Sequence, residues 1–344
     1  MVAVGIIGAS GYTGAELLRL IAAHPHFELA YATGDSQAGV PARQLYPSLA
    51  VAYPDLVFEP YDAARAAGLD VVFLGLPHQA SLTIAAELQG KVGCVVDLSA
   101  AFRLKDHTLY PRWYGFAHDH PELLGDAVYG LPELFRDDLP GASLIATPGC
   151  YVTASSLAIA PLVRRGLIEP NGVIIDAASG VSGAGRSLKH GSLFCTVDED
   201  FTAYGLLTHR HTPEIEQNLA HVAGASAQVL FTPHLAPMNR GILATCYARP
   251  TGAVTTDSVL EVLHAAYDAE PFVTVRTDPP STKATLGSNA VHVTACADER
   301  TGWVVAVAAL DNLTKGASGG AVQAANVALG LPETAGLPTV GLYP

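Results

Sequence analysis

The chain has 344 residues, of which 49% are hydrophobic and 15% are charged, so a large apolar core can form. This length exceeds the size at which a single core usually stops growing, which predicts two domains. The chain has 19 Lys and Arg residues and 32 Asp and Glu residues, and the resulting net charge of −13 argues against a nucleic-acid partner. The longest apolar stretches, such as 71–76 and 303–310, are far shorter than the roughly 18 residues of a membrane span, so we expect no membrane partner.

The five cysteines have no paired spacing, which is typical of reduced thiols rather than of a disulfide framework. Residues 1–5 lead directly into a predicted strand without a charged segment, so we expect no signal peptide. Both features predict a cytoplasmic protein.

The first part of the chain alternates short apolar strands with helical patterns, such as 15–21 and 81–88. The strands are predicted at 2–7, 27–32, 70–76 and 93–98. This alternation predicts an α/β fold, with a Rossmann-type, doubly wound parallel sheet over residues 1–148.

The second part begins with a predicted helix at 152–165, after which strands follow one another directly. They are predicted at 172–178, 227–232, 241–248, 291–297 and 303–310, with helices at 213–221 and 256–269. Direct succession predicts an α+β domain with a mixed or antiparallel sheet. A last helix at 321–329 follows a glycine-rich start containing Gly316, which suits close contact with a ligand or another backbone.

A glycine-rich turn lies between the first strand and the first helix, at Gly8, Gly11 and Gly14. Glycines let the backbone approach a pyrophosphate, and the start of a helix attracts its charge. The spacing predicts a dinucleotide site, with a purely structural turn as the alternative.

The second strand leads to Thr33, Asp35 and Ser36, where the ribose of a dinucleotide is expected. An acidic group there favours the free 2′-hydroxyl of NAD, whereas the hydroxyls of Thr33 and Ser36 suit the phosphate of NADP. Both cofactors therefore stay open.

Cys150 is the strongest single signal, because it follows a Pro-Gly turn and directly precedes a helix of small residues. The positive end of a helix favours a nucleophilic thiolate. Cys94, Cys246 and Cys296 lie in apolar strand patterns and are expected to be inert packing residues.

His209 and His211 precede a predicted helix in which Thr212 is the N-cap and Pro213 the first residue. Either imidazole suits general acid/base chemistry near neutral pH. Zinc binding is the alternative, but no third ligand of clear spacing accompanies them, and we assign no metal. Candidate cations for an anionic substrate are Arg103, Arg186, Lys189 and Arg240.

Taken in order, several motifs resemble those of the N-acetyl-gamma-glutamyl-phosphate reductases, in the aspartate-semialdehyde dehydrogenase-like group. The matching stretches are GASGYTGAELLRL, GLPHQAS, DLSAAFRL, YGLPEL, TPGCYVTA, SGVSGAGR, HRHTPEI, PMNRGI and DNLTKGASGGAVQAAN. The resemblance implies an NADP-binding domain of residues 1–148 and 313–344, with a catalytic and oligomerisation domain of residues 149–312. It also implies a homodimer or homotetramer.

The resemblance further implies that Cys150 is the nucleophile and that His209, or alternatively His211, is the acid/base. The cofactor is then held by Gly8, Ser10, Gly11, Tyr12, Thr13, Gly14, Thr33, Ser36, Pro77, Ser99, Ser182, Gly183, Asn312 and Gly316. Asp35 stands where the family often has a basic residue, so NAD stays open beside NADP.

The implied reaction is the NADPH-dependent reduction of N-acetyl-L-glutamyl 5-phosphate to the 5-semialdehyde through a cysteine thioester, in arginine biosynthesis. A lysine-pathway aminoadipyl-phosphate reductase of the same fold is the close alternative. A nucleotide-sensing protein without catalysis, or a zinc hydrolase using His209 and His211, would be of another class.

Overall fold

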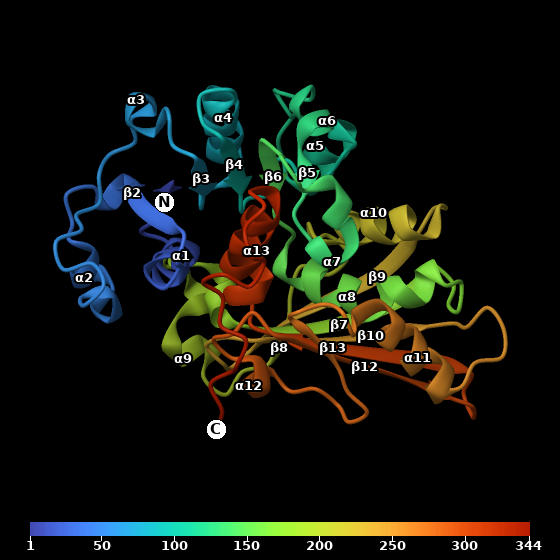
Figure 1. The fold of residues 1–344 in the computed structure, drawn as a ribbon. Coiled ribbons are helices and arrows are strands. Elements are labelled where there is room, and N and C mark those ends of the chain that lie inside the picture. The colour runs from blue at the N-terminus through green and yellow to red at the C-terminus, as the bar shows by residue number, and fades with distance from the viewer. The chain divides into compact units, whose positions relative to one another are not determined.

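The computed structural model describes all 344 residues, and the chain forms two compact units (Figure 1). Unit 1 contains Met1–Pro148 and Ala317–Leu337, and unit 2 contains Gly149–Gly316 and Pro338–Pro344. Residues 313–316 and 338–344 thus belong to the second unit, not to the first as expected. The last segment is held there by backbone hydrogen bonds from Asn289 N to Pro338 O (2.7 Å) and from Leu342 N to Leu286 O (2.7 Å).

Unit 1 is built on a six-stranded parallel sheet in the order β2-β1-β3-β4-β6-β5. Its strands are β1 (Val2–Ile7), β2 (Phe27–Ala32), β3 (Val71–Leu74), β4 (Cys94–Asp97), β5 (Val128–Tyr129) and β6 (Leu144–Ala146). The prediction of a doubly wound parallel sheet is confirmed. The strand order reverses between β1 and β3, and ligands bind such sheets at the carboxyl ends of the strands beside this point.

The helices of unit 1 are shown with its sheet in Figure 1. They are α1 (Tyr12–Ala22), α2 (Ala42–Leu45), α3 (Ala63–Ala66), α4 (His78–Leu88), α5 (Tyr110–Trp113), α6 (Leu123–Asp126), α7 (Pro132–Phe135) and α13 (Gly319–Ala328). On one face, Val72, Leu74 and Val95 pack against apolar side chains of α4, such as Leu82. The C-terminal helix α13 packs against α1, α7 and β4, and Ser318 Oγ donates a hydrogen bond to Thr13 O (2.8 Å).

Unit 2 is built on a seven-stranded mixed sheet in the order β11-β12-β13-β10-β7-β9-β8. Its strands are β7 (Asn171–Gly180), β8 (Thr202–Ala203), β9 (Gln228–Ala236), β10 (Ile242–Ala248), β11 (Val273–Val275), β12 (Val291–Asp298) and β13 (Trp303–Leu310). β10 is antiparallel to β7 and β13, whereas β7 and β9 are parallel. This confirms the predicted mixed sheet.

The helices of unit 2 are α8 (Cys150–Arg164), α9 (Phe194–Val197), α10 (Thr212–Ala223), α11 (Thr256–Tyr267) and α12 (Thr282–Thr285). Helix α8 packs on β10, β12 and β13, between α10 and α11. Every residue from Tyr151 to Val163 is buried, including the small polar residues Thr153, Ser155 and Ser156. None of the helices is both long and apolar enough to cross a bilayer.

Candidate active site

The glycine turn of unit 1 brings the end of β1 into close contact with the end of β3. Gly8 has φ +93°, and a Cβ there would lie 2.4 Å from Gly75 O, so only glycine fits. Gly14 packs on Ala9 in the same way. A Cβ at Gly11, the N-cap of α1, would meet only Gly8 O at 3.6 Å, and no side chain caps this helix. The open helix start fits the pyrophosphate of a dinucleotide.

The segment after β2 lies beside this turn. Thr33 is buried, and its hydroxyl accepts a hydrogen bond from Gly8 N (3.0 Å), while Ser10 Oγ donates to Gly34 O (2.9 Å). Asp35 and Ser36 are exposed, and Asp35 has φ +48°. Thr33 therefore stabilises the turn, whereas Asp35 and Ser36 stay accessible at the surface.

The other predicted residues of unit 1 lie at the ends of β3 and β4. Pro77 is the N-cap of α4. Ser99 is buried and donates to the Asp97 carboxylate (2.8 Å). Arg103 is also buried, and its guanidinium donates to Thr147 O (2.7 Å) and Leu98 O (3.0 Å). Arg103 thus stabilises the segment that leads to Cys150.

In unit 2, Cys150 is the first residue of α8, and Gly149 is the N-cap. Gly149 N donates to the carboxylate of Glu214 (2.9 Å), which is fully buried on α10. A Cβ at Gly149 would lie 2.3 Å from His211 Nε2, so glycine is required for this imidazole to lie against the start of α8. The helix start is thus bounded by one imidazole and one carboxylate.

The two histidines contact each other edge to face, with ring centroids 4.7 Å apart. His209 Nδ1 accepts a hydrogen bond from His211 N (3.1 Å). Burial, assisted by the Arg210 charge, lowers the pKa of His209 to about 4, so this ring is neutral at pH 7. Its proton then lies on Nε2, because Nδ1 is an acceptor.

Two tyrosines surround these rings. Tyr151 packs edge to face on both histidines, and its hydroxyl donates to His234 O (2.9 Å). Tyr204 donates to the Tyr151 hydroxyl (3.1 Å). Burial raises the pKa of Tyr151 and raises that of Tyr204 to about 12, so both stay protonated at neutral pH.

A cavity of about 460 Å³ lies over Cys150 within unit 2. Its walls combine one cysteine, both histidines, two cations and small polar residues. They are Cys150, Tyr151, Ser179, Gly180, Gly183, Ala184, Lys189, Gly191, Ser192, Thr202, Tyr204, His209, Arg210, His211 and Leu235. The site can therefore hold an anionic acyl group beside a thiol and an imidazole.

The structure brings Cys150, His209, His211, Gly183 and Lys189 to this cavity. Other predicted residues of unit 2 do not line it. Arg186 is exposed, Arg240 pairs with Asp311, Ser182 and Asn312 bond to each other, and Gly316 packs on Cys150. No group of three or more His, Cys, Asp or Glu side chains is arranged to hold a metal ion.

Two expectations are corrected here. Cys94 and Cys246 are buried, but Cys296 is exposed, because its position on β12 alternates with the buried ones. Helix α10 begins one residue early, with His211 rather than Thr212 as its N-cap.

Sequence reasoning missed Glu214, Arg210, Tyr151 and Tyr204. Arg210 lies inside the HRH motif and Glu214 three residues after it, so the motif itself held a usable signal. Tyr204 had none, because only the fold brings it to Tyr151.

Family models match most of the chain. Residues 3–142 match the NAD-binding domain of semialdehyde dehydrogenase, and residues 150–312 match the semialdehyde dehydrogenase dimerisation domain. Among solved structures, aspartate semialdehyde dehydrogenase II of Vibrio cholerae, complexed with ASA, has a TM-score of 0.70 at 16% identity, covering 95% of this chain and 98% of that one. The enzyme of Candida albicans with NADP gives the same TM-score and identity, and covers 95% and 98%. This likeness confirms the fold.

Curated relatives match along the whole length. The N-acetyl-gamma-glutamyl-phosphate reductase of Acidothermus cellulolyticus is 52% identical over 99% of both chains. That of Magnetococcus marinus is 48% identical over 99% of this chain and 98% of its own. The chain therefore belongs to the semialdehyde dehydrogenase family of oxidoreductases, in the group of N-acetyl-gamma-glutamyl-phosphate reductases.

Proposed function

We propose that this protein reduces N-acetyl-L-glutamyl 5-phosphate to N-acetyl-L-glutamate 5-semialdehyde and phosphate, with NADPH as the reductant, in arginine biosynthesis. The observation that carries the proposal is the cavity in which Cys150 meets an imidazole and two cations. The names of the relatives supply the substrate.

The reaction begins when the Cys150 sulfur attacks the acyl carbon. The bond from this carbon to the phosphate oxygen breaks, phosphate leaves, and a thioester remains on Cys150. A nicotinamide cofactor held at the glycine turn of Gly8, Gly11 and Gly14 would supply a hydride for the thioester carbon. Collapse of the resulting thiohemiacetal breaks the carbon–sulfur bond and releases the aldehyde and the thiol.

We assign the proton transfers to His211. Its Nε2 lies against Gly149, next to the nucleophile, so it can take the thiol proton and return it to the departing sulfur. His209 already carries a proton on Nε2 and is neutral, so it suits hydrogen-bond donation better than base catalysis. Lys189 and Arg210 hold the phosphate or the substrate carboxylate, with Arg186 and Arg103 as further candidates.

We propose NADP as the cofactor. One related structure contains it, and the exposed Ser36 can bond a 2′-phosphate, whereas Asp35 opposes one. The residues proposed to hold the cofactor are Gly8, Ser10, Gly11, Tyr12, Thr13, Gly14, Thr33, Ser36, Pro77, Ser99, Ser182, Gly183, Asn312 and Gly316.

The test runs the reaction backwards. Purified enzyme should oxidise N-acetylglutamate semialdehyde only when phosphate is present, and faster with NADP than with NAD. Mass spectrometry of enzyme quenched during turnover should find the acyl group on the Cys150 peptide. Faster turnover of the aminoadipate analogue would favour the lysine-pathway reaction, and absence of any phosphate-dependent turnover would refute the proposal.

We also propose a homodimer or homotetramer in the cytoplasm. The face of the unit 2 sheet opposite α8 carries half-buried apolar side chains, among them Ile174, Tyr247, Trp303 and Val305. The matching family model is described as a dimerisation domain, which supports a second copy as the partner of this face. Tyr247→Asp should then lower the mass measured by light scattering, whereas an unchanged mass would exclude this face.

A further inference from the structure

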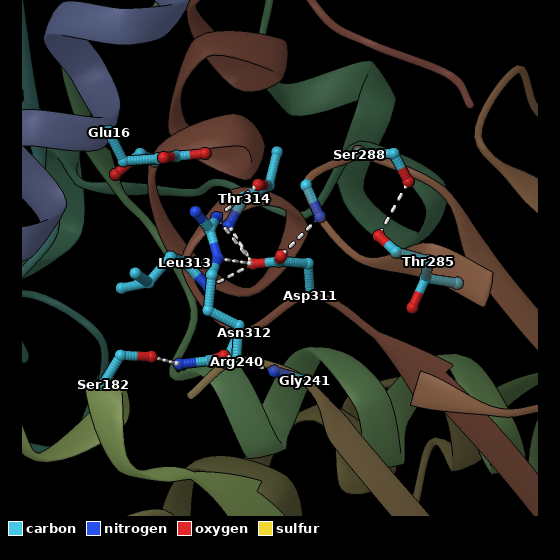
Figure 2. Close-up of polar contacts among 12 residues, drawn as sticks. Glu16, Ser182, Arg240, Gly241, Thr285, Ser288, Asp311, Asn312, Leu313 and Thr314 are labelled. Atoms are coloured by element: carbon cyan, nitrogen blue, oxygen red, sulfur yellow. Dashed lines mark hydrogen bonds and ion pairs between the residues drawn. The ribbon is translucent and has the colours of Figure 1, made fainter. Parts of the chain in front are cut away.

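Asp311, at the end of β13, is a fully buried carboxylate to which several backbone groups donate (Figure 2). Leu313 N and Thr314 N each donate to Oδ1 at 2.9 Å, and Gly287 N donates to Oδ2 at 2.7 Å. Burial of a carboxylate is unfavourable unless its oxygens are well paired. Asp311 therefore fixes the turn that follows β13 and the loop around Gly287.

Arg240 pairs with this carboxylate from the turn between β9 and β10 (Figure 2). Its Nη2 and Nε lie 2.9 and 3.2 Å from Asp311 Oδ1, and Nη2 also donates to Thr314 Oγ1 (2.9 Å). The Arg240 side chain is 23% exposed. The sequence predicts that Arg240 binds a substrate anion, but a guanidinium committed in this way is poorly placed for that role.

Asn312, the next residue, connects this cluster to the wall of the Cys150 cavity. Its Oδ1 accepts from Gly241 N (2.7 Å), and its Nδ2 donates to Ser182 Oγ (3.0 Å; Figure 2). Ser182 precedes Gly183 and Ala184, which line the cavity. A displacement of Asn312 would therefore move the loop that carries this wall.

The same segment reaches the nucleophile. Gly316 N donates to Asp311 O (2.9 Å), and a Cβ at Gly316 would lie 2.9 Å from Cys150 Cβ. The backbone of Gly316 thus covers one side of Cys150. Asp311 holds both ends of the segment from Asn312 to Gly316.

We propose that Asp311 and Arg240 are positioning residues for the Cys150 site, acting through Asn312 on the cavity wall and through Gly316 on the nucleophile. This assignment deepens the proposed function and rests on it. Arg240 then has no direct contact with the substrate, and Arg240 and Asp311 act together as an ion pair.

The kinetic test compares Arg240→Gln, Asp311→Asn and the double variant in phosphate-dependent oxidation. If the pair positions the site, both single variants lose about tenfold or more in kcat, and their KM for phosphate and semialdehyde changes by less than about twofold. The kcat of the double variant should be no lower than that of the less active single variant, because the two residues act together. A KM increase confined to Arg240→Gln, with kcat unchanged, would instead assign Arg240 to substrate binding and overturn the proposal.

Two further variants guard against a folding defect. Arg240→Lys keeps the charge and should recover part of the lost kcat. Arg276→Gln breaks the Arg276–Asp278 ion pair of the same unit, which shares no residue with this cluster, and should behave as wild type.

A second measurement does not depend on turnover. Iodoacetamide should alkylate Cys150 at least about threefold faster in Asp311→Asn and Arg240→Gln, because Gly316 no longer covers its side chain. An unchanged alkylation rate would refute positioning even if the enzyme is active. If the wild-type enzyme shows no phosphate-dependent turnover, the proposed function is refuted. The alkylation rate of Cys150 would still test whether Asp311 and Arg240 position this site.

Discussion

Helices α1 and α8 begin alike, but their starts meet different partners. Each has a glycine N-cap and no side-chain cap of its own. The start of α1 is open in front of Gly11, whereas the N–H of Gly149 at α8 is bonded to Glu214, 65 residues further along the chain. One start is suited to receive an anion from solution, and the other already holds a carboxylate from the protein. The same local sequence signal therefore gives an open helix start in one unit, where we propose cofactor binding, and an internally bonded start in the other, where we propose the reaction.

The largest effect is expected at the reaction site. Cys150→Ser should lower turnover at least about 10³-fold, because the hydroxyl is a far weaker nucleophile, while NADP binding in unit 1 stays unchanged. Phosphate-dependent oxidation and a fluorescence titration with NADPH measure the two properties. Cys195→Ser, at an exposed cysteine outside the cavity, is the control. Substantial turnover in Cys150→Ser would refute the thioester.

Gly8→Ala tests the binding surface. Its Cβ would meet Gly75 O, so we expect NADPH affinity to fall at least about tenfold. Gly39→Ala is the matched control, because Gly39 also has positive φ (+85°) but nothing within 4 Å of its Cβ. Both variants should lose about 1–3 kcal/mol of stability to backbone strain, and only Gly8→Ala should lose affinity. Equal affinities would contradict the assignment of this turn to the cofactor.

Glu214→Ala tests the internal partner of α8. Removal of the carboxylate leaves Gly149 N without this acceptor, which should lower the free energy of unfolding by about 2 kcal/mol in urea denaturation. Glu214→Gln keeps an oxygen at the same place and should cost less. If both variants match wild type, the start of α8 does not need this partner.

The last test is a pH dependence of stability. The pKa of His209 is lowered from 6.5 to about 4 in the folded protein, so the unfolded chain binds this proton first as the pH falls. The contribution of His209 is therefore complete above pH 6.5 and is lost as the pH falls towards 4. Burial also lowers the pKa of His24, His118 and His292, so the readout is the difference between wild type and His209→Gln. The curve of the variant should be flatter over this range, and parallel curves would contradict the assignment.

Much of the fold could be predicted from local patterns. The strands 2–7, 27–32 and 303–310 were predicted with the bounds that the structure gives, because continuous apolar runs end at clear turn residues. The two-residue strands β5 and β8 were missed, since such short pairings are set by neighbouring strands rather than by their own sequence.

The site was predictable where one segment carries it. Cys150 and the HRH motif can each be identified from their residue types and from the predicted helix that follows. The ion pair between Arg240 and Asp311 could not be predicted, because it joins residues 71 positions apart. In the sequence, Arg240 looks like any exposed arginine. Glu214 lies close to the HRH motif, but its bond to Gly149 joins residues 65 positions apart and was not predicted.

The backbone passes between the two units three times, after Pro148, after Gly316 and after Leu337. A fragment that stops at Pro148 would lack α13 and would leave bare the surfaces of α1, α7 and β4 that this helix covers. A frameshift near residue 317 would harm the nucleotide-binding half encoded at the opposite end of the gene. No single cut of the chain therefore yields both units intact.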